Sequence, residues 1–133
     1  MIQGIRDRTI VVCTFDINHT EHYSMVRPDF ARTRSLVETS NLLREIGEKV
    51  TLMICAPDLE GVKFECIERI SAEFPDVDIV LLTERVSRED FAKAIETGIR
   101  GILPSFLSTR TLCKMLELIG LGEEIFLGAE AFD

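Results

Sequence analysis

The chain has no long apolar run. No stretch approaches the ~18 residues needed to span a bilayer. Residues 1–6 also lack the apolar stretch and the small-residue cleavage site of a secretory signal. We therefore expect a soluble, cytoplasmic protein that does not bind membranes.

Basic residues are scarce relative to acidic ones. Lys and Arg total 15 against 23 Asp and Glu, which gives a formal net charge of −8. Such a chain repels a phosphate backbone, and no basic cluster with interleaved aromatic residues offsets this charge. The sequence also lacks the G-x-G-x-x-G, Walker and G-x-S-x-G motifs. We expect no nucleic-acid binding by this domain itself, no enzymatic activity and no cofactor.

Cysteines occur without any C-x-x-C spacing, which argues against a metal centre or a redox pair. We interpret all four as reduced core residues, since free cysteine is among the most buried residue types: Cys13, Cys55, Cys66 and Cys113.

What the chain does contain is an alternation of apolar runs and helical patterns. Its 133 residues suit one domain. Continuously apolar, β-branched runs predict strands covered on both faces, as in a parallel sheet, at residues 9–15, 50–56, 77–83 and 100–103. Helical spacing with end signals predicts helices at residues 29–46, 62–74, 87–98 and 108–120. This alternation indicates a doubly wound α/β sheet.

The segment from residue 17 to residue 33 fits neither periodicity. Asp29 is the expected cap of the first helix, and Tyr23–Val26 is the stretch that could form a brief second strand. The segment barely accommodates a helix and a strand, so the second strand is the least defined part of the expected sheet.

Four short stretches, taken in order, resemble a receiver domain of response regulators. They are PDLEG at 57–61, FPDVDIVLLT at 74–83, GIRGIL at 98–103 and GLGEE at 120–124. The resemblance is to the N-terminal receiver of LuxR/NarL-type transcription regulators. It implies a flavodoxin-like fold with a five-stranded parallel sheet in the order 2-1-3-4-5. The domain would cover residues 1–124, and residues 125–133 would begin a linker to a DNA-binding domain not present in this chain.

The residues that accept a phosphoryl group in this family are not matched here. Counting back from Gly61 through Pro57 places Met53 at the acceptor position, and a thioether cannot form an acyl phosphate. Asp58 is the alternative acceptor if the register is shifted. We expect Asp58 to lie beyond the strand, with its side chain pointing out of the cleft.

The other parts of the phosphorylation site are also degenerate. The family uses an acidic pair to hold Mg²⁺, a hydroxyl on the fourth strand and a lysine on the fifth. Only the hydroxyl is retained, at Thr83. The resemblance places the acidic pair at Thr14 and Phe15, with Asp16 nearby, the lysine at Ser105 and the aromatic switch at Ile102. It implies a receiver that cannot be phosphorylated.

Mixed charge gathers around the helices at 88–97 and 108–120. Receivers resembling this one commonly dimerise through these helices and the strand between them, so we expect a homodimer, with a signalling protein as a further partner. The basic residues of the expected interface are Arg85, Arg88, Lys93, Arg100, Arg110 and Lys114.

Two other functions remain open. The first is a small-ligand or metal sensor that uses the vacated cleft, which Phe15 and Met53 would make apolar. Possible metal-binding side chains lie close together but match no established spacing, so we expect no metal: Asp16, Asn18, His19, Glu21 and His22. The second is a stand-alone adaptor that docks on another receiver or on a kinase.

Overall fold

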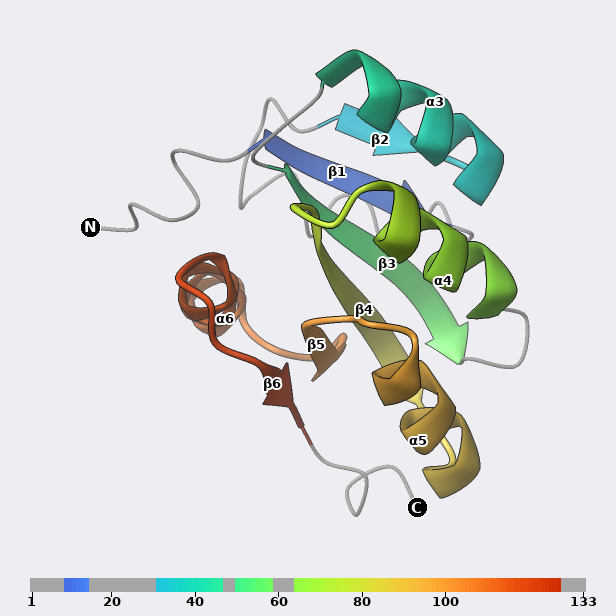
Figure 1. Cartoon of the computed structure of the whole chain (residues 1–133). Helices are drawn as coiled ribbons and strands as arrows, with labels where there is room; N and C mark the ends of the chain where they lie inside the picture. Colours follow the sequence, from blue (N-terminus) through green and yellow to red (C-terminus); the bar gives the residue numbers. More distant parts are fainter. Residues whose placement is uncertain (1–8, 15–30, 47–49, 59–63, 128–133) are drawn as a thin grey trace.

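The computed structural model describes residues 9–14, 31–46, 50–58 and 64–127 (Figure 1). These residues form one sheet of six parallel strands in the order β2-β1-β3-β4-β5-β6. The strands are β1 (Thr9–Thr14), β2 (Ala31–Thr33), β3 (Val50–Asp58), β4 (Asp78–Arg85), β5 (Gly101–Pro104) and β6 (Ile125–Phe126). The helices are α3 (Leu36–Ile46), α4 (Phe64–Glu73), α5 (Arg88–Glu96) and α6 (Thr109–Gly120). The flavodoxin-like α/β fold and the strand order 2-1-3-4-5 are therefore confirmed, with β6 added at the edge.

An apolar cluster covers each face of the sheet. Both faces of the strands are therefore buried, which explains why the strands are continuously apolar rather than alternating between apolar and polar residues. On one face, α3, α4 and α5 pack against alternate strand residues such as Ile54 and Leu81. On the other, α6 packs against their neighbours, including Met53 and Val80. Figure 1 shows this division, with α6 across the sheet from the other three helices. Among the described residues, no helix is long and apolar enough to cross a membrane.

The two helices after the central strands begin where the sequence predicts. Ser87 accepts a hydrogen bond from the Asp90 amide at 3.1 Å, and Ser108 accepts one from the Thr111 amide at 3.2 Å. Such caps satisfy an amide that lacks a partner within the helix, and each stabilises the fold by about 1 kcal/mol.

The first described helix begins later than predicted. Residues 31–33, expected within a helix capped by Asp29, form β2 and pair with β1. The helix starts at Leu36, and Ser35 accepts a hydrogen bond from the Glu38 amide at 3.1 Å. The placement of the cap at Asp29 is therefore wrong, because the Ser35-x-x-Glu38 signal marks the true start. The alternative strand at Tyr23–Val26 lies outside the described residues.

The carboxyl-terminal boundary also differs from the prediction. Residues 125 and 126, expected at the start of a linker, form β6 and pair with Gly101 and Ile102 of β5. The Leu127 amide continues the ladder by donating to the Ile102 carbonyl at 3.0 Å. The apolar triplet Ile125 to Leu127 therefore belongs to the domain, because the edge of β5 offers it both backbone partners and apolar surface.

Candidate functional site

The carboxyl edge of the sheet is where open α/β folds bind ligands. At this edge, Thr83 of β4 pairs in register with Ala56 of β3 on one side and with Pro104 of β5 on the other. The Ser105 amide donates a hydrogen bond to the Thr83 carbonyl at 2.9 Å. The structure therefore brings Thr83 and Ser105 together, with Ala56 beside them on the central strand.

Met53 does not lie at this edge. It pairs with Val12 and Val80 and is completely buried in the cluster beneath α6. Met53 precedes Ala56 by three residues, which is about 10 Å along a strand at ~3.3 Å per residue. Met53, which the family resemblance places at the acceptor position, thus lies three strand positions before the residue level with Thr83, and β3 continues through Pro57 and Asp58.

Asp58 is also placed differently from the prediction. It is the last residue of β3 and pairs with Arg85, so it does not lie beyond the strand. Its Cα is two positions past Ala56, or about 7 Å along the strand direction. The backbone of Asp58 is thus displaced from the level of Thr83.

The side chain of Thr83 is buried, and its hydroxyl donates a hydrogen bond to the Arg85 carbonyl at 3.0 Å. This bond gives Thr83 a structural role at the end of β4. Ile102, at the switch position, is fully buried and pairs with Leu81 and Phe126. Because the Ile102 side chain is aliphatic, it has no hydroxyl that could move between the interior and water, as an aromatic switch residue would.

The remaining predicted site residues are placed only in part. Thr14 ends β1 and pairs with Cys55, one level below Ala56. Outside the described residues lie Phe15, Asp16, Asn18, His19, Glu21 and His22. Within the described parts of the chain, His, Cys, Asp and Glu side chains form no group of three able to hold a metal ion.

No family model matches this chain, and no curated protein matches its sequence. Solved structures do share its fold. The isolated receiver (REC) domain of RcsB from Salmonella enterica serovar Typhimurium, in its apo form, superposes with a TM-score of 0.77 at 15% identity. That match covers 93% of this chain and 96% of the RcsB domain. The chain has the fold of a receiver domain.

Two further structures place the same fold in different settings. A LuxR family DNA-binding response regulator from Silicibacter pomeroyi has a TM-score of 0.68 and 18% identity, over 90% of this chain and 97% of that one. A pilus assembly-related protein from Burkholderia pseudomallei has a TM-score of 0.69 and 23% identity, over 90% and 92%. At these identities the likeness establishes the receiver fold alone.

Ala56 is the residue of β3 that is level with Thr83, and the expected site residues did not include it. The apolar run that begins at Val50 ends at Ala56, and the run after it in the sheet order ends at Thr83. Because the carboxyl ends of parallel strands meet at one edge, aligning the ends of the runs with Thr83 would have identified Ala56. Counting from the loop motif instead selects Met53, which is buried in the core.

The basic residues predicted at an interface lie around the β5 and β6 side of the receiver fold. Arg85 and Arg88 are exposed at the end of β4 and the start of α5, whereas Arg110 and Lys114 are exposed on α6, across the sheet. Some of this charge is used within the chain. The Lys93 ammonium lies 3.4 Å from Glu89, and the Arg100 guanidinium pairs with Asp78 and Glu124 at 3.8 Å and 3.6 Å.

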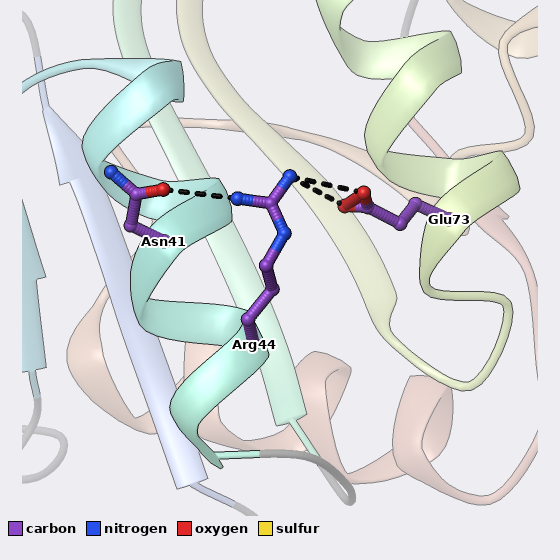
Figure 2. A network of polar contacts seen from close by, with 3 residues as sticks. All are labelled: Asn41, Arg44 and Glu73. Carbon is purple, nitrogen blue, oxygen red and sulfur yellow. Dashed lines mark hydrogen bonds and ion pairs between the residues drawn. The ribbon is translucent and has the colours of Figure 1, made fainter.

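A polar network joins α3 to α4 on the opposite side of the domain (Figure 2). Nη2 of Arg44 donates to both carboxylate oxygens of Glu73, at 3.0 Å and 3.1 Å. Nη1 donates to the Asn41 side-chain oxygen at 3.0 Å. Both charged side chains are about half exposed, so the pair contributes at most about 1 kcal/mol. The network orients the two helices and forms no buried polar site.

Of the four cysteines, Cys13 and Cys55 are buried, as predicted, whereas Cys66 and Cys113 are only partly buried. Burial raises the pKa of the Cys13 thiol; hydrogen bonds from the neighbouring Thr39 and Thr33 oppose this shift, and Glu38 reinforces it. Burial likewise raises the pKa of the Cys113 thiol. Raised pKa values keep these thiols protonated and unreactive, which fits a packing role.

Proposed function

We propose that this domain does not accept a phosphoryl group and acts as a protein-interaction module in signal transduction or transcription regulation, without enzymatic activity. The observation that carries the proposal is the pairing of Thr83 with Ala56 at the carboxyl edge. An alanine at this level offers no carboxylate to attack phosphorus.

Among the described residues, the groups around this position give no substitute. A receiver needs a cation on the fifth strand to neutralise the phosphoryl charge, and Ser105 follows β5 at that place. The Thr83 hydroxyl already donates to the Arg85 carbonyl. Asp58, the last residue of β3, pairs with Arg85 rather than with Thr83. Phosphoryl transfer requires these parts in place together, so their joint departure from the family pattern supports an inactive site.

Mass spectrometry after incubation with acetyl phosphate and excess Mg²⁺ tests the proposal. We expect no gain of a phosphoryl group, and no thermal stabilisation by beryllofluoride under the same conditions. A receiver with an intact site, treated in parallel, is the positive control. A phosphoryl group mapped to Asp58 or Asp16 would refute the proposal and identify an active receiver of unusual geometry.

We further propose that the interaction is homodimerisation through α5 and α6. Mixed charge on these helices, including the exposed Arg110 and Lys114 on α6, suits a symmetric contact. Arg110→Glu combined with Lys114→Glu should weaken the dimer in sedimentation at low salt. Arg69→Glu on the exposed side of α4 is the matched control and should not weaken it. An unmodified chain that stays monomeric at high micromolar concentration would refute this part of the proposal.

A second candidate function is that of an adaptor in a protein assembly. It is favoured by the pilus assembly-related protein of Burkholderia pseudomallei and by a pilus assembly protein of Burkholderia thailandensis, which share the fold at 23% and 21% identity. The oligomeric state of the chain in solution distinguishes the two functions. An adaptor would remain monomeric and form a stoichiometric complex with a separate assembly or signalling protein, whereas the favoured function requires self-association.

A further inference from the structure

The strand β6 lies along the edge of β5, at the side of the sheet between α5 and α6 (Figure 1). Its backbone is held by two hydrogen bonds at 3.0 Å, from the Ile125 amide to the Arg100 carbonyl and from the Leu127 amide to the Ile102 carbonyl. This is the pattern by which an extended peptide adds to an open sheet edge. The edge of β5 is thus a surface that accepts a strand.

The side chains of this short segment divide between the two faces of the sheet. Phe126 packs against the cluster beneath α3, α4 and α5, whereas Ile125 and Leu127 pack against the cluster beneath α6. All three residues remain partly exposed. The edge therefore recognises an alternating apolar triplet, with one aromatic side chain on the α5 side and two aliphatic ones on the α6 side.

Charge and shape add to this recognition. The Arg100 guanidinium reaches Glu124 at 3.6 Å, immediately before the triplet, and Asp78 at 3.8 Å. Gly101 makes room for the strand, since a Cβ at this position would lie 3.1 Å from the Ile125 carbonyl oxygen and 2.9 Å from Cδ1 of Ile119. The edge is thus matched to an acidic residue followed by three apolar ones.

The connection that delivers β6 to this site is short. Residues 121–124 join the end of α6 to β6, and Gly122 within it has a φ of +104°. A Cβ at Gly122 would meet no other atom within 4 Å, and the connection is held to the end of α6 by backbone hydrogen bonds from the Gly122 amide to the Ile119 carbonyl at 3.0 Å and from the Glu123 amide to the Leu118 carbonyl at 3.1 Å. A strand of two residues that remains partly exposed opens more readily than the central strands. An edge element joined by a short connection is the kind of element that two copies of a chain can exchange, because every contact is kept in the exchanged form.

We propose that the edge of β5 is a strand-accepting interaction site, which residues 124–127 fill within one chain and the same residues of a second copy fill by exchange. The choice of a second copy as the partner rests on the proposed dimerisation. Residues 124–127 are the segment that the two copies would exchange. A second copy is the partner that fits, since it carries the acidic residue and the apolar triplet that the edge already binds.

A fluorescent peptide of residues 121–127 tests the site. In Ile125→Asp/Phe126→Asp the chain's own strand no longer competes, so this variant should bind the peptide at least about tenfold more tightly than the unmodified chain does. Val37→Asp introduces a carboxylate at an exposed apolar residue of α3 and should behave as the unmodified chain. Phe126→Ala provides a milder variant if the double variant does not fold. Equal binding to all folded variants would overturn the site.

Shortening the connection tests the partner. Deletion of Gly122 and Glu123 prevents β6 from reaching its own β5, so the shortened chain should sediment as a dimer that excess peptide dissociates. A shortened chain that stays folded and monomeric would overturn exchange with a second copy. These results are separable from the α5 and α6 contact, because Arg110→Glu/Lys114→Glu leaves the peptide site intact, and peptide binding to the vacated edge does not require dimerisation.

Discussion

Replacing Met53 by aspartate distinguishes the two positions that sequence and structure assign to this residue. Loop spacing places Met53 at the carboxyl edge, where a carboxylate would be solvated. The structure instead places Met53 in the middle of β3, completely buried against the residues beneath α6. In that position the introduced carboxyl has no water around it, and we expect Met53→Asp to unfold the domain at neutral pH.

The expected magnitude follows from two contributions. Losing a buried methionine side chain costs about 2–5 kcal/mol. Keeping the introduced carboxyl protonated at pH 7 costs up to about 4 kcal/mol more, from an ordinary pKa of about 3.9 and 1.36 kcal/mol per pH unit. The sum is comparable with the whole stability of a small domain, about 5–15 kcal/mol.

Urea unfolding followed by circular dichroism measures this effect, with Met53→Asn as the uncharged control of similar shape. The folded state raises the pKa of the introduced carboxyl, so the penalty relative to asparagine is largest at neutral pH and falls as the pH is lowered. At pH 5.5 it should decline to about 2 kcal/mol. If Met53→Asp and Met53→Asn were equally stable at pH 7, both close to the unmodified chain, Met53 would have to lie at the solvated edge, and the register of β3 against β4 would be wrong.

Three further predictions concern the glycines, the polar network and the buried thiol. Gly98→Ala should destabilise the domain by about 1–2 kcal/mol in thermal unfolding, since a φ of +91° disfavours side chains and the new Cβ would meet the Ser71 hydroxyl; Gly122→Ala, which meets nothing, should cost less. Arg44→Ala should cost no more than about 1 kcal/mol, and a double-mutant cycle with Glu73→Ala should show a coupling that high salt reduces. The folded pKa of Cys13 is raised above its ordinary value of 9.0, so its contribution to stability is present below that pH and is lost as the pH rises further. Urea midpoints between pH 8 and pH 10 should therefore fall more steeply for the unmodified chain than for Cys13→Ala, and parallel slopes would contradict this.

The elements whose signals are local could be predicted from the residues alone. The apolar runs that became β1, β3, β4 and β5 are continuous because both faces of those strands are covered. The caps at Ser87 and Ser108 act within one turn of helix, so their hydrogen bonds were foreseeable from neighbouring residues. The Ser35-x-x-Glu38 signal was equally local and would have corrected the start of α3.

How these elements align depends on contacts between residues that are far apart in the chain. Met53 and Ala56 lie in one continuous strand. Two sequence signals disagree on which of them belongs at the site, since the count from the loop motif selects Met53 and the ends of the apolar runs select Ala56. The level of each is set by the pairing of β3 with β4, which places Ala56 beside Thr83 and buries Met53 under α6. Likewise, residues 125 and 126 are too few to carry a periodic signal of their own, and they became a strand because β5 presents an open edge that fits them. The register between distant strands depends on which side chains are buried together on each face of the sheet. A local sequence pattern does not specify those long-range contacts.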